Sequence, residues 1–253
     1  METRKFKLLS GVQCETSKLI GAHQEYFTAP QYTDNGSGLN KCLSEVIVSL
    51  GSLKGITEEQ AKQLLSQDRK QILMQLRDFS MSRHKDFKFN YKYKNTDGVE
   101  VIDEIVMPFD LKNFPGKDYG FQAEEYEEIW KGEFKEFEFE LIDAKLKVKW
   151  EPLRGEHESL ALDVPRQKRS THTLVKLRHP RYFHQKDKNK QGTWINLDLK
   201  KVSYDDLEDL KEEFGKKEGD QDTTMLFKNP ETGRDEAVDV TLLPAFFFPS
   251  QAQ

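Results

Sequence analysis

The stretch of residues 57–109 constrains the fold most, because its apolar pattern changes period once. Its first part spaces apolar residues as one face of a helix does, at Ile72, Leu73, Leu76 and Phe79. Its second part alternates aromatic with polar residues, as a half-buried strand does, at Phe87, Phe89, Tyr91 and Tyr93. The sequence therefore predicts a helical segment that leads into an aromatic hairpin.

The ends of these predicted elements carry their own signals. Thr57 and Gln60 have the spacing of a capping box at the start of a first helix. Asp68 is predicted to open a second helix, where its charge suits the positive end of the helix dipole. Arg77 is placed on the side of that helix opposite the apolar stripe. Residues 95–98 supply the turn of the hairpin.

Similar patterns predict the other elements of the chain. They are strands at 6–9 and 16–20, helices at 39–50 and 123–131, a hairpin at 137–150, a helix that opens at Asp205, and a last hairpin at 224–240. Gly215 is expected to end the helix that opens at Asp205. Residues 111–120 contain Pro115, Gly116 and Gly120, so they are interpreted as a linker.

The order of these elements repeats once along the chain. Each half has a strand pair, a Gly-turn with His and Glu, helices, and a turn-rich hairpin, and Asp68 in the first half corresponds to Asp205 in the second. The two Gly-turns are 21–25 and 155–158. The sequence therefore predicts an α+β protein of two duplicated units, residues 1–115 and 125–253. Each unit is expected to have a small antiparallel sheet with packed helices and a protruding aromatic hairpin.

Composition indicates a soluble protein with much solvated or partner-facing surface. Hydrophobic residues make up only 36% of the chain, whereas 33% of the residues are charged. Two cysteines do not make a disulfide framework, and the sequence shows neither a signal peptide nor an apolar run long enough to span a membrane. A reducing cytoplasm is therefore the expected compartment.

The charges are arranged in blocks. Residues 166–190 contain nine basic residues and one acidic residue, and they lie between the acidic stretches 118–140 and 205–222. Because the whole chain has a net charge of −5, this arrangement favours protein docking over nucleic-acid binding. The candidate partner-binding residues are Lys168, Arg169, Lys176, Arg178, Arg181, Tyr182 and Phe247.

A search for catalytic and metal-binding motifs finds no HExxH, paired CxxC, P-loop, GxGxxG or Gly-x-Ser-x-Gly pattern. His157 stands between Glu156 and Glu158. It is interpreted as a solvated turn histidine, because neighbours on a strand point to opposite faces and would not converge on a metal. The chain is expected to be no enzyme and to hold no cofactor or metal.

The central stretch also resembles a known family. A leucine pair, an Asp-Arg pair, an apolar helix that ends in Leu-Arg, a nearby serine and an aromatic hairpin are similar to the baseplate hub assembly proteins of T-even-type contractile-tailed phages. The residues are Leu64, Leu65, Asp68, Arg69, Leu76, Arg77 and Ser80. The resemblance extends to the Gly-turn at Gly21, to residues 37–41 and to the ending Phe246-Phe247-Phe248-Pro249.

The sequence departs from the family at one place. Members often carry a Cys-Pro-x-Cys-Gly-like knuckle in the hairpin, where this chain has Tyr91-Lys92-Tyr93-Lys94-Asn95. No thiolate is available there for zinc, so aromatic packing is expected to hold the hairpin.

The resemblance implies a structural or assembly protein of a contractile tail. Its partners would be other tail or baseplate hub proteins, with the tape-measure protein among them, and its location would be the host cytoplasm or the virion baseplate. Nucleic acid and membrane are not expected partners. Two alternatives stay open: a nucleic-acid-binding module that uses residues 166–190, and a metal hydrolase. Whether the protein stays in the finished virion or leaves as a chaperone also stays open.

Overall fold

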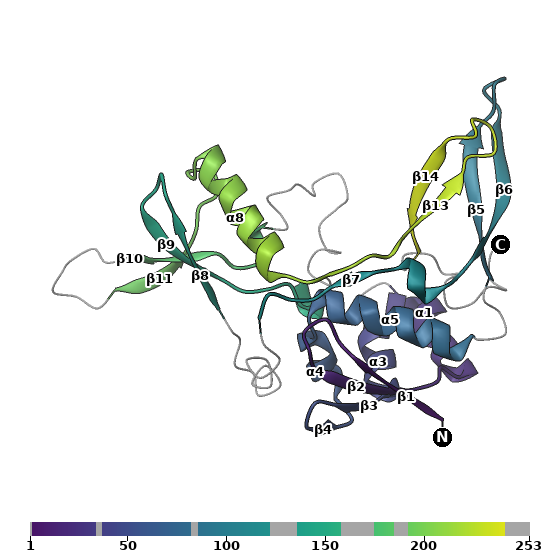
Figure 1. Ribbon diagram of the computed structural model, residues 1–253, viewed down its shortest axis with the longest axis horizontal. Helices are drawn as coiled ribbons and strands as arrows, with labels where there is room; N and C mark the ends of the chain where they lie inside the picture. Colours follow the sequence, from purple (N-terminus) through teal and green to yellow (C-terminus); the bar gives the residue numbers. More distant parts are fainter. Residues whose placement is uncertain are drawn as a thin grey trace.

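A computed structural model describes residues 2–33, 37–81, 86–121, 136–157, 175–184 and 192–240 (Figure 1). Within these ranges the chain is an α+β protein with several small antiparallel sheets, as the sequence predicts. No helix in the described part is both long and apolar enough to cross a membrane. The predicted helix at 123–131 lies outside the described residues.

The first sheet has four antiparallel strands in chain order: β1 (Thr3–Lys7), β2 (Gln13–Ser17), β3 (Ile47–Leu50) and β4 (Leu53–Lys54). The short helices η1 (Gly21–Gln24), α1 (Glu25–Thr28) and α2 (Pro30–Thr33) follow β2. Three further helices, α3 (Ser37–Val46), α4 (Glu58–Gln63) and α5 (Ser66–Ser80), complete this part of the molecule. Its core contains Leu8, Cys42, Leu43, Leu64 and Ile72.

Three elements predicted for this part of the molecule have wrong bounds. The predicted helix 39–50 ends at Val46, and the following residues Ile47 to Leu50 form β3, which pairs with β2. Their apolar spacing continues that of the helix, so only pairing with a distant strand distinguishes the two states. Strands predicted at 6–9 and 16–20 lie about three residues earlier, because Leu8 and Leu9 are buried in the turn between them.

Helix α5 buries the predicted stripe of Ile72, Leu73, Leu76 and Phe79. The capping box at Thr57 is confirmed: the Gln60 N–H donates to Thr57 Oγ1, and the Thr57 N–H donates to Gln60 Oε1. The helix itself begins at Ser66, so Asp68 lies in its first turn.

The placement of Arg77 is wrong, because its side chain is fully buried. Its guanidinium donates to the Asp86 carbonyl and lies over the Phe109 ring, so it joins the helix to the hairpin that follows. A long side chain beside an apolar stripe can turn inward when a distant segment offers acceptors, and periodicity does not show those acceptors.

The second sheet also has four strands in chain order. Its antiparallel strands are β8 (Phe137–Leu141), β9 (Leu146–Trp150), β10 (Arg181–His184) and β11 (Thr193–Asn196). Helix α8 (Tyr204–Lys217) packs on it through Leu207, Leu210 and Phe214. Gly215 does not end this helix, which continues for two more residues.

Two hairpins form a projecting arm (Figure 1). One hairpin is β5 (Asp86–Lys94) with β6 (Glu100–Pro108), and the other is β13 (Thr224–Lys228) with β14 (Asp235–Asp239). Between the arm and the two sheets, η2 (Leu111–Asn113) leads into β7 (Gly116–Lys117), which pairs with β12 (Asp220–Gln221).

An aspartate near the start of each long helix binds the first hairpin turn of its own sheet. The Asp68 carboxylate in α5 accepts from the Ser10 N–H, and the Asp206 carboxylate in α8 accepts from the Asp143 and Ala144 N–H groups. In α8 the residue that makes this contact is Asp206, next to the predicted Asp205. The duplication itself, and the unit bounds 1–115 and 125–253, stay predictions.

Candidate partner-binding surfaces

The arm is held together by aromatic packing between its two hairpins. The Phe227 ring of β13 lies 5.3 Å from that of Phe89 and 4.9 Å from that of Tyr91, both with edge-to-face geometry. Tyr93 stacks on Tyr91 within β5. Such ring pairs stabilise a contact beyond the area that they bury. Aromatic packing therefore holds the hairpin β5–β6, as the sequence predicts.

Polar contacts fix the two hairpins of the arm in register. The Tyr91 hydroxyl donates to Glu236, whose other oxygen accepts a 2.5 Å hydrogen bond from Asn229 Nδ2. At the far end, the Thr96 N–H in the first turn donates to Glu231 Oε1 in the second turn, at 2.9 Å. The arm is therefore pinned along its length and at its tip.

The arm exposes aliphatic residues. Ile102 and Val106 lie on the outer face of β6 with exposed fractions of 52% and 49%, and Leu226 is exposed on β13. Lys88 and Lys92 lie on the paired strand, where Lys88 Nζ is 2.8 Å from Glu104 Oε1. Exposed aliphatic side chains on a projecting arm, bordered by charges, are typical of a protein-docking surface.

The structure describes four of the seven candidate partner-binding residues. Lys176 is exposed, and Tyr182 packs against the core of the second sheet. Arg178 makes a bidentate ion pair with Glu218 and lies 4.6 Å from the Phe214 ring centroid, so it has an internal role. Arg181 pairs with Glu136. Lys168, Arg169 and Phe247 lie outside the described residues.

The basic residues on the outer face of the second sheet are matched by acids. Lys149 Nζ lies 3.5 Å from Glu136 Oε2 and 3.6 Å from Glu138 Oε1, and Arg181 also pairs with Glu136. Lys147 pairs with Glu138. A nucleic-acid surface needs cations that are available to phosphate. On this described face the cations, of which only Arg181 belongs to residues 166–190, are engaged by acids, which disfavours nucleic-acid binding at this face.

The same face ends in an exposed aromatic pair. Phe183 of β10 and Trp194 of β11 lie opposite each other with ring centroids 5.6 Å apart. Lys149 Nζ lies 4.7 Å from the centroid of the Trp194 ring. All four residues of β11 are exposed, and β11 is the outermost strand of its sheet.

A buried polar cluster lies between α4 and the segment that follows β9. Arg154 donates to Gln63 of α4 and pairs with both Glu151 and Glu156, each at 2.7 Å. Ligand atoms of Glu151, His157 and His179 lie within 4.8 Å of one another, and such a set has the composition of a zinc site. The interpretation of His157 as solvated is wrong: it is buried in a helical turn, where it converges with Glu151 and His179.

Hydrogen bonding argues against a metal at this cluster. His157 Nδ1 accepts from the Arg154 N–H at 3.2 Å, so in the neutral imidazole the remaining proton is on Nε2. A metal-ligating histidine needs the opposite arrangement, with its free nitrogen deprotonated. Burial and the nearby charges of Arg154, His179 and Arg178 lower the pKa of His157 to about 3, so the imidazole is neutral near pH 7.

His23 makes the same kind of local hydrogen bond as His157. Its Nδ1 accepts from the Ile20 N–H, three residues earlier, and its Nε2 faces Glu45 at 3.5 Å. Burial lowers its pKa as well. Two buried histidines with the same capping bond indicate that both have a structural role.

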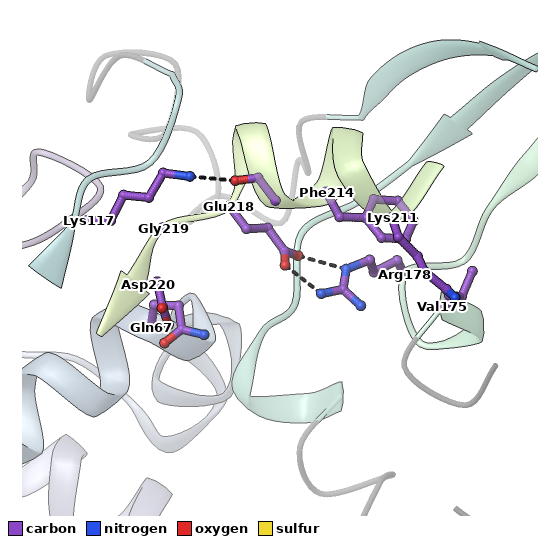
Figure 2. A pocket seen from close by; sticks show the side chains of 10 residues that line it. Gln67, Lys117, Val175, Arg178, Lys211, Phe214, Glu218, Gly219 and Asp220 are labelled. Atoms are coloured by element: carbon purple, nitrogen blue, oxygen red, sulfur yellow. Dashed lines mark hydrogen bonds and ion pairs between the residues drawn. The ribbon is translucent and has the colours of Figure 1, made fainter. Parts of the chain in front are cut away.

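A cleft of about 410 Å³ separates the start of α5 from the end of α8 (Figure 2). Figure 2 shows its cations bound within the chain: Lys117 Nζ donates to the Gly215 carbonyl at 2.6 Å, and Arg178 pairs with Glu218. Lys211 pairs with Glu208. We therefore interpret the cleft as a polar junction between α5 and α8.

Sequence reasoning missed the residues that build this junction. Arg154, His157 and Arg69 are buried polar residues whose partners are distant in sequence. One signal was available: the Gly-x-His pattern occurs twice, at Gly21 and Gly155.

Comparison of the chain with models of protein families, with curated proteins and with solved structures finds no match.

Proposed function

We propose that this chain is a non-enzymatic assembly protein that docks on other proteins through its projecting arm. The observation that carries the proposal is the pair Ile102 and Val106, about half exposed on a two-hairpin arm that is pinned by Tyr91, Glu236 and Asn229. A rigid projection loses little freedom on binding, so its exposed apolar area contributes efficiently to affinity.

The family resemblance of the sequence gives this docking a setting. We propose the baseplate hub of a contractile phage tail, with other hub or tail proteins and the tape-measure protein as candidate partners. The resemblance lies in the helix that carries Asp68, Arg69 and Arg77, and in the hairpin after it. All three side chains are buried, so the motif maintains the fold that supports the arm.

Two observations favour docking over the alternative functions. Three described basic residues, Lys149, Arg178 and Arg181, are paired with acids, which disfavours phosphate binding by these three side chains. The Nε2 proton of His157 disfavours a metal hydrolase at the cluster of Glu151, His157 and His179.

The test is co-purification of the chain with the hub and tape-measure proteins of a contractile-tailed phage. The parent chain is expected to bind at least one of them, and a double variant, Ile102→Asp with Val106→Asp, is expected to lose that binding. Val48→Asp, at an exposed position on β3 away from the arm, is the matched control and should bind as the parent does. Equal binding by the double variant, or no binding by the parent, would refute the proposal.

A further inference from the structure

The first turn of α5 contacts three other segments of the chain. The Asp68 carboxylate accepts from the Ser10 N–H in the turn between β1 and β2. The Gln67 N–H donates to the Tyr119 hydroxyl, and Gln67 Oε1 accepts from the Gln221 N–H of β12. Tyr119 lies in the segment that leads to the second sheet, and β12 leads to the arm. This one turn therefore joins both parts of the chain to the first sheet.

A single peptide group connects two of these contacts. The Ser10 N–H bonds Asp68, and the Leu9 carbonyl of the same peptide group accepts from the Tyr119 N–H at 3.0 Å. Leu9 also lies against Gly116, where an added Cβ would come 2.6 Å from Leu9 Cδ2. Because the peptide group is planar, a movement that breaks the bond to Asp68 also displaces the acceptor of Tyr119.

Asp68 is a buried acid at this position, with an exposed fraction of only 2%. The like-charged Asp118 acts on its charge, and no Lys, Arg or His of the described residues does. From β2, the buried thiol of Cys14 lies close to it. Burial raises the pKa of Asp68 to about 7, so both forms of the carboxyl are populated near neutral pH.

The cations next to this site in the sequence are engaged elsewhere. Arg69 donates to Asn40 Oδ1 and to the Ala61 carbonyl, and Lys117 donates to the Gly215 carbonyl. A charged Asp68 therefore has no counter-ion while the turn is closed on α5, whereas water hydrates it once the turn moves away. Loss of the proton thus favours the open turn.

We propose that Asp68 is a pH-sensitive switch, which keeps the β1–β2 turn closed on α5 when it is protonated and favours local release of this turn and of residues 116–119 when it is ionised. The first sheet is then held more tightly to the rest of the chain below neutral pH than above it. Linkage fixes the sign, because the closed form binds a proton that the open form releases. With pKa values of about 7 and about 3.9 for the two forms, the open population increases by up to roughly 80-fold from pH 5 to pH 8.

Amide hydrogen exchange of the purified full chain at pH 5 and pH 8 tests the proposal. After correction for the intrinsic pH dependence of exchange, protection of the Ser10 and Tyr119 amides should fall about tenfold or more as pH rises. The Gly55 amide, which donates to the Val48 carbonyl between β3 and β4, is the control and should keep its protection. An equal fall at Gly55, or no fall at Ser10, overturns the proposal.

Three variants assign the effect to Asp68. Asp68→Asn keeps an acceptor for the Ser10 N–H but has no proton to release, so protection should be equal at the two pH values. Asp118→Asn removes the like charge and leaves the buried contact, so the fall should be smaller than in the parent. Asp97→Asn, at the exposed tip of the arm, should behave as the parent does. An undiminished fall in Asp68→Asn or in Asp118→Asn would refute the switch. Because the measurement uses the chain alone, its outcome is independent of the proposed docking function.

Discussion

Asp68 and Ser10 lie 58 residues apart in the chain, and the Asp68 carboxylate accepts a 3.0 Å hydrogen bond from the Ser10 N–H. Both residues are buried. The bond ties the start of α5 to the turn between β1 and β2, so it holds the helix on its sheet. Because burial disfavours the charged form, the pKa of Asp68 is raised to about 7.

Asp68 should make the protein less stable as pH rises. Between about pH 4 and pH 7 the folded state keeps a proton that the unfolded state, with an aspartate pKa of about 3.9, has released. Asp68→Asn keeps an acceptor for Ser10 but removes this titration. Urea denaturation at pH 5 and pH 8 should show a smaller loss of unfolding free energy in the variant than in the parent. A larger loss of unfolding free energy in the variant than in the parent would contradict a raised pKa for Asp68.

His157 should act in the opposite direction. Its pKa of about 3 in the folded state lies below the value of about 6.5 in an unfolded chain, so the unfolded state takes up a proton that the folded state refuses. The neutral His157 therefore contributes fully to the free energy of unfolding above about pH 6.5, and this contribution is lost as pH falls towards 3. His157→Asn offers an oxygen to the Arg154 N–H without titrating, so thermal melts from pH 7 to pH 4 should show a shallower decline. If the melting temperature of the variant declines as steeply as that of the parent, His157 is not a cause of the loss of stability at low pH.

Gly155 should not tolerate a side chain. A Cβ at this position would lie 2.3 Å from Arg69 Nη1, and that guanidinium is fixed by bonds to Asn40 and to the Ala61 carbonyl. Gly155→Ala is expected to cost about 1–3 kcal/mol of unfolding free energy. Gly21 opens the corresponding turn, and a Cβ there meets nothing within 4 Å. Gly21→Ala is therefore the control, and an equal loss in both variants would show that the contact with Arg69 is not the cause.

Leu76 should be among the least replaceable residues of α5. It is fully buried, and Leu76→Asp would place a charge without a partner in the core. Such a burial costs several kcal/mol, comparable with the roughly 5–15 kcal/mol that stabilises a whole domain. Lys70→Asp, at a partly exposed position of the same helix, should change the free energy of unfolding by about half a kcal/mol. Thermal melting of both variants distinguishes them, and the reverse order would mean that the helix faces the other way.

Local patterns predicted the elements whose signals lie within one segment. The stripe of α5, the capping box at Thr57 and the hairpin β5–β6 depend on neighbours a few residues away, and the structure confirms them. The end of α3 and the burial of Arg77 depend on distant residues, namely β2 for the first and Asp86 with Phe109 for the second. Periodicity contains no information about such partners.

The same limit applies to the candidate surfaces. Residues 166–190 look basic in sequence, but Arg178 and Arg181 are matched by Glu218 and Glu136, which come from other parts of the chain. The outermost position of β11 was not predicted either, because it is defined by the strand order of the sheet.

The arm has a consequence for synthesis on the ribosome. Its first hairpin, which carries Phe89 and Tyr91, is complete at Pro108, but the Phe227 ring that covers them is translated more than a hundred residues later. At the usual rate of roughly 5–20 residues per second, the aromatic face stays uncovered for several seconds or longer in every nascent chain. During that interval the uncovered aromatic face of each nascent chain is available for aggregation and for chaperone binding. A chain whose synthesis ends before residue 224 lacks β13 and cannot cover this face.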